Sequence, residues 1–223
     1  DFVDDNKEGY GKYIYNNGNY YIGQWLKGNM NGKGKEYYPN GFLKYDGDFV
    51  NDKREGFGTF IFEDGEYYIG QWSNNIMHGQ GKIYSRDGKL KFDGYFFNGK
   101  KHGFNCRLFY NNGGYYIGDM VNGKRHGKGQ EFNSKGFLIY EGNFIDDELE
   151  GYGNLIYVDG RFYAGQFSKS KKHGKGTTFD MDGSIIYQGD FINDIREGEG
   201  KSFYQNGNYY IGQLKNDKMQ PYN

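Results

Sequence analysis

The sequence reads Tyr21-Ile22-Gly23-Gln24-Trp25, and nine residues after Gly23 it continues with Gly32-Lys33-Gly34. Both patterns recur along the whole chain. The Tyr-x-Gly pattern occurs nine times in steps of 23 or 24 residues, with its aromatic residue at Tyr21, Tyr45, Tyr68, Phe92, Tyr116, Tyr140, Tyr163, Tyr187 and Tyr210. The Gly-x-Gly pattern begins at Gly9, Gly32, Gly56, Gly79, Gly103, Gly127, Gly151, Gly174 and Gly198. A fixed period of this length is typical of an array of identical supersecondary units.

Each unit is predicted to be a β-hairpin. Tyr68, Gly70 and Trp72 occupy alternate positions, which places them on one face of a strand. A polar turn such as residues 51–54 leads into a second extended segment at 56–62, and two short strands joined by a polar turn form a hairpin. The 39 glycines exclude long helices. The expected fold is all-β: an elongated, single-layer array of about nine hairpins that forms a twisted, rod-like antiparallel sheet.

The glycines have a packing role as well as a turn role. A Gly opposite an aromatic ring exposes backbone on which the ring can lie, so the rings of neighbouring hairpins can stack closely. The residues predicted to form this repeat core are Tyr21, Gly23, Trp25, Tyr68, Gly70, Trp72, Tyr116 and Gly118.

Composition indicates one domain without a membrane-spanning stretch. The repeat runs through residues 1–223 without a change in composition, so we expect one continuous array. The first repeat lacks its Tyr-x-Gly pattern, so we expect the natural array to continue upstream. Lys and Arg number 28 against 29 Asp and Glu, which argues against nucleic acid as the main partner. The single Cys106 excludes an intrachain disulfide and fits a reducing, cytoplasmic compartment.

The repeats are of two alternating kinds. In copies such as Tyr67-Tyr68-Ile69 the residues flanking the central ring are apolar, whereas in Lys44-Tyr45-Asp46 they are charged. The second face of the sheet should therefore carry an aromatic patch on every other hairpin, with a structural period of 47 or 48 residues. Two interpretations stay open: the extra rings thicken the core, or they form a docking surface for a partner.

The fifth unit departs from the pattern. Asn105 stands where the second Gly is expected, Cys106 follows, residues 111–114 are expected to hold an extra residue, and Met120 replaces Trp or Phe. A local bend or bulge is expected here.

The repeat resembles the MORN repeat (membrane occupation and recognition nexus). The resemblance rests on Tyr68-Ile69-Gly70-Gln71-Trp72, on Met77-His78-Gly79-Gln80-Gly81 and on Asp87-Gly88, and it covers nearly the whole chain. Within that family the chain is similar to the MORN-only scaffold proteins of apicomplexan and related protists. The resemblance implies self-association, cytoskeletal protein partners, a cytoplasmic, cytoskeleton-associated location and a role in cell division.

No pattern of catalytic residues stands out, so no enzyme activity and no cofactor are expected. The Gly-x-Gly units imitate phosphate-binding loops, but no helix follows them. The histidines precede the first Gly of their units, a position that the repeat itself dictates. His102, Cys106 and His126 make the one candidate metal site, a partial zinc site with three ligands at best, and no metal is expected.

A non-catalytic scaffold that forms a homodimer is the leading hypothesis. The last copy of the repeat ends in Met219-Gln220-Pro221-Tyr222, and no further hairpin follows to cover its strand edge. The predicted dimer interface comprises Phe203, Tyr210, Ile211, Leu214, Met219, Pro221 and Tyr222. The alternative is that Met219 and Tyr222 fold back and cap the array.

A peripheral membrane module is the competing hypothesis. Basic residues at equivalent turns should line one edge of the array and attract anionic phospholipid headgroups. These residues are Lys100, Lys101, Lys124, Arg125, Lys171 and Lys172, and the acidic run at residues 146–150 interrupts them. Carbohydrate-binding repeats of secreted proteins share the Tyr and Gly composition and form a third class.

Overall fold

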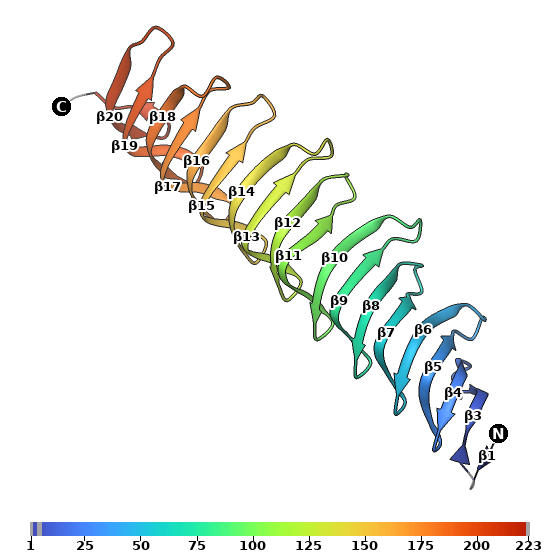
Figure 1. Ribbon diagram of the computed structural model, residues 1–223. Coiled ribbons are helices and arrows are strands. Elements are labelled where there is room, and N and C mark those ends of the chain that lie inside the picture. Colours follow the sequence, from blue (N-terminus) through green and yellow to red (C-terminus); the bar gives the residue numbers. More distant parts are fainter. Residues whose placement is uncertain (1, 4–5, 222–223) are drawn as a thin grey trace. The chain divides into compact units, whose positions relative to one another are not determined.

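The computed structural model describes residues 2–3 and 6–221, and every regular element in that part of the chain is a β-strand. The chain divides into two compact units, Asp1–Phe109 and Tyr110–Asn223. Each unit is described by itself below. Figure 1 shows that the strands of each unit follow one another in chain order.

The first unit contains strands β1 to β11. They are β1 (Phe2–Val3), β2 (Asn6–Lys7), β3 (Gly9–Ile14), β4 (Tyr20–Leu26), β5 (Asn29–Tyr37), β6 (Leu43–Val50), β7 (Lys53–Ile61), β8 (Tyr67–Ser73), β9 (Ile76–Tyr84), β10 (Leu90–Phe97) and β11 (Lys100–Phe109). The second unit contains β12 (Tyr115–Val121), β13 (Lys124–Phe132), β14 (Leu138–Ile145), β15 (Glu148–Ile156), β16 (Phe162–Ser168), β17 (Lys171–Phe179), β18 (Ile185–Ile192), β19 (Ile195–Phe203), β20 (Tyr209–Lys215) and β21 (Lys218–Met219).

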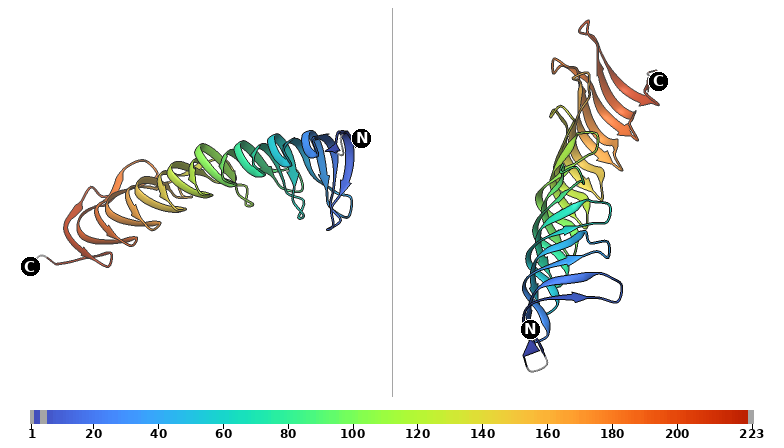
Figure 2. Two further views of the ribbon diagram at one scale, coloured as in Figure 1. Left: turned by 90° about the horizontal axis from the view of Figure 1, so that it is seen from below. Right: turned by 90° about the vertical axis from the view of Figure 1, so that its right-hand side faces the viewer.

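Each strand pairs antiparallel with the next strand in the chain, from β3 to β11 in the first unit and from β12 to β21 in the second. The predicted all-β fold is therefore confirmed, and each unit is a twisted, single-layer array of hairpins that is elongated along the stacking direction (Figure 2). The prediction of one continuous array over residues 1–223 stays a prediction, because the two units are not placed relative to one another.

The predicted inner face is confirmed in the repeats of both units. Tyr21, Tyr68 and Tyr116 are fully buried, and Trp25 and Trp72 are nearly so. Each Tyr ring lies flat across a pair of glycines on adjacent strands, such as Gly70 and Gly81, which are directly paired. A Cβ atom added to Gly81, the second Gly of Gly79-Gln80-Gly81, would come within 2.3 Å of Cε2 of Tyr68. Where a Tyr ring faces it, the second Gly of Gly-x-Gly is thus required because the ring occupies the space of a side chain.

The first Gly of Gly-x-Gly is required for a different reason. Gly32, Gly56 and Gly79 have φ angles of 82°, 66° and 68°, in the left-handed region that a residue with a Cβ rarely adopts. The strand bends here, and the pairing register shifts on the facing strand between Gly70 and Trp72. In a Gly-x-Gly of this kind, the first Gly therefore allows a backbone bend and the second allows a ring to pack against the backbone.

The buried rings of neighbouring hairpins contact one another edge to face. Tyr21 packs against Phe49 at 5.0 Å between ring centroids, Phe49 against Tyr45 at 5.2 Å, and Tyr45 against Trp72 at 5.4 Å. Edge-to-face geometry is favoured by the ring quadrupoles. The rings thus form a continuous row that links one hairpin to the next within a unit.

The short turns also link consecutive hairpins. The backbone N–H of Asp52 donates to the carbonyl of Met30, while the Asp52 carboxylate accepts from the Met30 N–H at 2.7 Å. The pair Asp194 and Lys172 repeats this exchange in the second unit. Each turn therefore satisfies the backbone of the hairpin before it.

The outer face carries the aromatic patch expected on every other hairpin. Tyr20 stacks on Tyr37 at 4.6 Å with the rings 10° from parallel. The same stacking joins Tyr67 to Tyr84, Tyr115 to Phe132, and Phe162 to Phe179. The predicted period of 47 or 48 residues is confirmed.

The expected irregularity in the fifth repeat is confirmed, but its position is corrected. The four-residue turn at 111–114 has the ordinary hydrogen bonds, with Tyr110 N–H donating to the Gly114 carbonyl and Gly113 N–H to the Tyr110 carbonyl. The extra residue is Asn105, which has a φ of 53° and lengthens β11 to ten residues. Cys106, not Asn105, takes the place of the second Gly, because its Sγ packs against Gly94. Phe92 lacks the phenol oxygen of Tyr, which leaves room for that sulfur.

Replacing Trp72 by Ala tests the inner-face packing. Its indole N–H donates to the Gly58 carbonyl at 3.2 Å, and its ring contacts Tyr45 and Tyr68. Removal of a buried aromatic side chain is expected to cost about 3–5 kcal/mol. Limited proteolysis should show new cleavage near β6 to β9, whereas Phe57→Ala, on the exposed outer face, should leave the pattern unchanged. Unchanged cleavage in the Trp72 variant would contradict the assignment.

Candidate functional site

One position of each hairpin carries most of the chemistry of the inner face. It is the residue that pairs across the hairpin with the second buried side chain, as Arg54 pairs with Phe49. We call it the slot residue. The slot residues are Met30, Arg54, Met77 and Lys101 in the first unit, and Arg125, Leu149, Lys172, Arg196 and Met219 in the second.

Arg54 shows how a cation is held in the slot. Its guanidinium lies over the rings of Tyr45, Phe60 and Trp72 at 5.1, 4.8 and 5.4 Å. Its Nε and Nη2 atoms donate to one oxygen of Glu36 at 2.8 and 2.5 Å. The two side chains are only 14% and 17% exposed, so the pair is largely removed from water.

The other two slot arginines also face a carboxylate. Arg125 bonds to Glu131 at 3.1 Å and to Asp147 at 3.3 Å, and its guanidinium lies 4.9 Å from the centre of the Phe144 ring. Arg196 bonds to Asp217 at 2.9 Å and lies over Tyr187. In each case the chain supplies the counter-charge of its own slot cation.

The slot lysines have no such partner. Among the described residues, no carboxylate oxygen lies within 4.0 Å of Nζ of Lys101 or Lys172. Lys101 lies over the Phe92 ring at 5.1 Å, and burial, together with the nearby Lys91, lowers its pKa. Lys172 lies over Phe191 at 5.4 Å.

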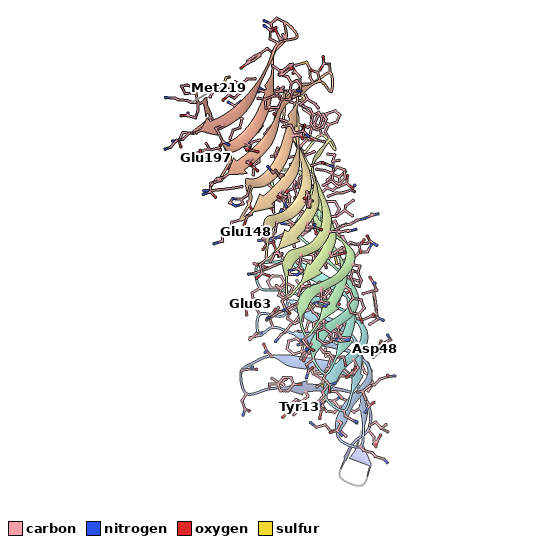
Figure 3. The ribbon with its side chains drawn as sticks, turned by 90° about the vertical axis from the view of Figure 1, so that its left-hand side faces the viewer. Tyr13, Asp48, Glu63, Glu148, Glu197 and Met219 are labelled. Atoms are coloured by element: carbon pink, nitrogen blue, oxygen red, sulfur yellow. The ribbon has the colours of Figure 1, made fainter. Side chains whose placement is uncertain are left out.

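The inner face of the first unit contains a groove of about 630 Å³. Aromatic side chains (Tyr13, Tyr15, Trp25) and charged ones (Lys44, Glu36, Asp52, Arg54) share its wall around Met30. Tyr13 lies on β3, at the beginning of the array (Figure 3). A mixed aromatic and charged wall suits a peptide or a polar small molecule.

The six basic residues expected along one edge divide between two faces. Lys100, Lys124 and Lys171 are exposed, whereas Lys101, Arg125 and Lys172 point to the inner face and pack on rings. The expected single basic edge is therefore wrong, because successive strand residues point to opposite faces. Of the exposed three, Lys124 faces Asp146, and the acidic Glu148 lies on the same edge of the second unit. Figure 3 shows Glu148 and Glu197 on that unit.

The three residues of the partial metal site are not assembled. The Cys106 side chain is buried on the inner face, and its Sγ lies 3.3 Å from the backbone carbonyl oxygen of His102, not from the ring. The His102 ring contacts Phe97 instead. His126 belongs to the other unit. No group of three or more His, Cys, Asp or Glu side chains arranged for a metal ion occurs in residues 2–3 and 6–221.

The C-terminal residues partly follow the alternative in which the chain folds back. Strand β21 pairs with β20, and the Gln220 N–H and the Tyr210 hydroxyl complete this contact by donating to the carbonyls of Gln213 and Gln220. Leu214 is 2% exposed and is therefore not available to a partner, a correction to the predicted interface.

The rest of the predicted interface stays untested. Ile211, Met219 and Pro221 are exposed, and Phe203 and Tyr210 are half-buried. Figure 3 shows Met219 at the last strand of the second unit. Tyr222 lies outside the described residues.

Four exposed aromatic residues on the outer face are absent from the expected site residues. They are Tyr10, Phe57, Phe104 and Tyr152, which are 70%, 56%, 83% and 65% exposed. Each follows the first Gly of its repeat, and the sequence carries a signal for them: this residue is aromatic in alternate copies up to Tyr152, is Lys or Gln in the copies between, and is Glu199 in the last copy.

Comparison with known proteins identifies the repeat. The MORN repeat model matches nine segments: residues 1–20, 21–42, 45–67, 68–89, 92–114, 116–136, 140–160, 163–185 and 187–209. The chain belongs to the MORN repeat family, a non-enzymatic repeat module suited to interaction with proteins or membranes. No curated protein matches the chain.

Two solved structures are distant matches. A mutant of the TCP10 domain of CPAP from Danio rerio is 16% identical with a TM-score of 0.41, covering 82% of this chain and 90% of that one. Virginiamycin B lyase from Staphylococcus aureus is 10% identical with a TM-score of 0.18, covering 93% and 70%. The described residues contain no helix that could span a membrane.

The buried phenols predict how stability depends on pH. Burial raises the pKa of Tyr140 to about 12 and raises the pKa values of Tyr45 and Tyr68 as well. A phenol in the unfolded chain ionises near pH 10, so the unfolded chain loses the proton first. The free energy of unfolding should be constant up to about pH 10 and fall as the pH rises through about 12. Denaturant midpoints measured against pH check this: Tyr140→Phe should reduce the slope, and exposed Tyr152→Phe should not.

The Arg54–Glu36 pair predicts a rescue. Glu36→Gln leaves the guanidinium without a carboxylate in a largely buried place, which should cost roughly 3 kcal/mol. Adding Arg54→Met should restore most of that stability, since Met30 and Met77 occupy the equivalent slots. Asp46→Asn, which breaks an exposed pair with Lys35, should cost under about 1 kcal/mol. Chemical denaturation measures all three, and a double variant as unstable as the single one would contradict the slot's tolerance of Met.

Proposed function

We propose that the chain is a non-catalytic scaffold that binds protein partners along its hairpin arrays and forms a homodimer. The observation that carries this proposal is the recurrence of one exposed aromatic residue on alternate hairpins. Tyr10, Phe57 and Phe104 are separated by 47 residues each in the first unit, and Tyr152 occupies the same position in the second. Exposed aromatic side chains contribute strongly to protein interfaces.

The spacing of these rings suits an extended partner. Tyr10 on β3 and Phe57 on β7 are four strands apart, which is about 19 Å at the usual strand separation. Between them the outer face carries ion pairs, such as Lys33 with Asp48 and Lys35 with Asp46. Several weak contacts repeated along one array add up to a stable complex.

The cellular role follows from the family resemblance. The chain is proposed to act in the cytoplasm as a cytoskeleton-associated scaffold that organises a cytoskeletal or membrane-associated complex in cell division, as the resemblance to the apicomplexan scaffolds implies. The proposal includes no enzyme activity and no cofactor.

Homodimerisation is tested by molar mass. Tyr209, Ile211 and Met219 are exposed apolar residues on the last two strands, and light scattering should give twice the chain mass. The variant Tyr209→Ser with Ile211→Ser should be monomeric, whereas Tyr152→Ser, which removes an equally exposed ring elsewhere in the same unit, should stay dimeric. A monomeric wild-type chain would remove self-association from the proposal.

A second candidate is binding of anionic phospholipid headgroups, favoured by the exposed Lys100 and Lys171. Only these and Lys124 remain of the predicted basic edge, so binding to phosphatidylserine vesicles is expected to be weak and lost at physiological salt. Vesicle flotation at two salt concentrations measures it. Retention at physiological salt that disappears when the three lysines are changed to Gln would place lipid binding ahead of the scaffold role.

A further inference from the structure

The charged slot residues are of two kinds: those whose counter-charge the chain supplies and those whose counter-charge it does not. Arg54, Arg125 and Arg196 each bond to a carboxylate within their own unit. In the described part of the chain, Lys101 and Lys172 have no carboxylate within ion-pair distance of Nζ. A half-buried ammonium without a counter-charge is costly, so its presence calls for a physical reason.

Packing does not supply that reason. The slot holds Met in three other hairpins, at Met30, Met77 and Met219, and Leu149 in a fourth. The same position of the hairpin therefore accepts an uncharged side chain. A lysine at this position adds a charge that the fold does not need.

Lys172 retains donors for a ligand. Its Nζ lies 3.4 Å from the Tyr157 hydroxyl and 5.4, 5.7 and 5.9 Å from the centres of the Phe191, Tyr163 and Tyr157 rings. The nearby Asp194 carboxylate accepts from the backbone N–H of Lys172 and does not form an ion pair with its ammonium. An ammonium has three donors, so at least two remain for an acceptor.

The charged groups near Lys101 do not neutralise it. Lys91 and Glu66 both act on Lys101 electrostatically, but they form an ion pair with each other, so the three groups together carry one net positive charge. The ammonium lies over the Phe92 ring on the inner face, and the residue is half-buried. An anion placed here would be attracted in a partly desolvated setting, where electrostatic interactions are stronger than in water.

We propose that Lys101 and Lys172 each receive a carboxylate from an acidic segment of a protein partner lying along the inner face of its unit. The partner would supply the group that Glu36, Glu131 or Asp217 supplies to the slot arginines. A bilayer is a poorer fit, because a flat surface meets the exposed neighbours Lys100 and Lys171 before it reaches side chains packed on inner-face rings. The inference rests on the proposed protein-binding function and names the chemistry of the partner.

A labelled peptide of ten glutamates tests the proposal, with a ten-residue glutamine peptide as the uncharged control. Fluorescence anisotropy with the full chain should show binding of the glutamate peptide only. The variant Lys101→Met with Lys172→Met should bind at least tenfold more weakly. The control variant Lys100→Met with Lys171→Met removes the same charge from the adjacent exposed residues and should bind within twofold of wild type.

Thermal unfolding should show that the slot variant is folded, since Met occupies that slot elsewhere; Lys101→Gln with Lys172→Gln is the second variant if it is not. Equal loss in the slot and control variants would show general charge attraction and overturn the proposal, as would a wild-type chain that does not bind the glutamate peptide. Loss of phosphatidylserine vesicle binding in the slot variant but not in the control would assign the site to lipid and also overturn the proposal.

Molar mass measured in parallel separates a failure of this proposal from a failure of the proposed scaffold function, because dimerisation does not depend on the slot lysines.

Discussion

A tyrosine ring lying across a pair of glycines is the contact on which the rest of this structure depends. A single-layer sheet has no second layer to bury its apolar side chains, so each ring must be covered by its own strand and by its neighbours. The glycine pair lets the ring lie against backbone, and the Tyr68 hydroxyl then donates to the carbonyl of Gln71 at 2.8 Å. This contact between the ring and the glycine pair recurs in each regular hairpin. It fixes the position of the ring, of its hydroxyl and of both strands. Where the chain has Phe92 in place of Tyr, Cys106 replaces the facing glycine, which shows that the two positions are coupled.

Much of the fold could be predicted because the same sequence pattern recurs nine times along the chain. The alternation of Tyr68, Gly70 and Trp72 predicts the buried face, and the 47-residue alternation of Tyr20 and Tyr67 predicts the stacked pairs on the outer face. A bulge in the fifth repeat could be predicted, but its position could not. Whether Asn105 or a residue in the following turn is the extra one depends on which residue adopts a positive φ, and Asn is acceptable at both positions.

The candidate site was harder to predict, for a reason that lies in strand geometry. Lys171 and Lys172 are adjacent in sequence and look like one basic turn, yet they point to opposite faces of the sheet and have different surroundings. The cation in the slot is surrounded by rings that come from three different strands, as Tyr45, Phe60 and Trp72 surround Arg54. The sequence contains these residues, but their convergence becomes visible only when the pairing register is known. The separation of the two faces also separates two of the proposals: the exposed aromatic residues lie on the outer face, and the slot lysines lie on the inner face.

The account depends most directly on the space occupied by the tyrosine ring, and a pair of glycine substitutions measures it. A Cβ at Gly70 would lie 2.4 Å from the Tyr68 hydroxyl and 2.6 Å from Cα of Gly81, whereas a Cβ at Gly11 would lie 3.5 Å from Trp25, an ordinary contact. Neither glycine has a positive φ, so backbone strain does not separate them. Gly70→Ala should lower the free energy of unfolding by about 3 kcal/mol through overpacking, and Gly11→Ala should leave it unchanged or raise it by about 0.5 kcal/mol through lower chain entropy. Equal stability of the two variants in chemical denaturation would contradict the claim that ring and glycine pair together determine this fold.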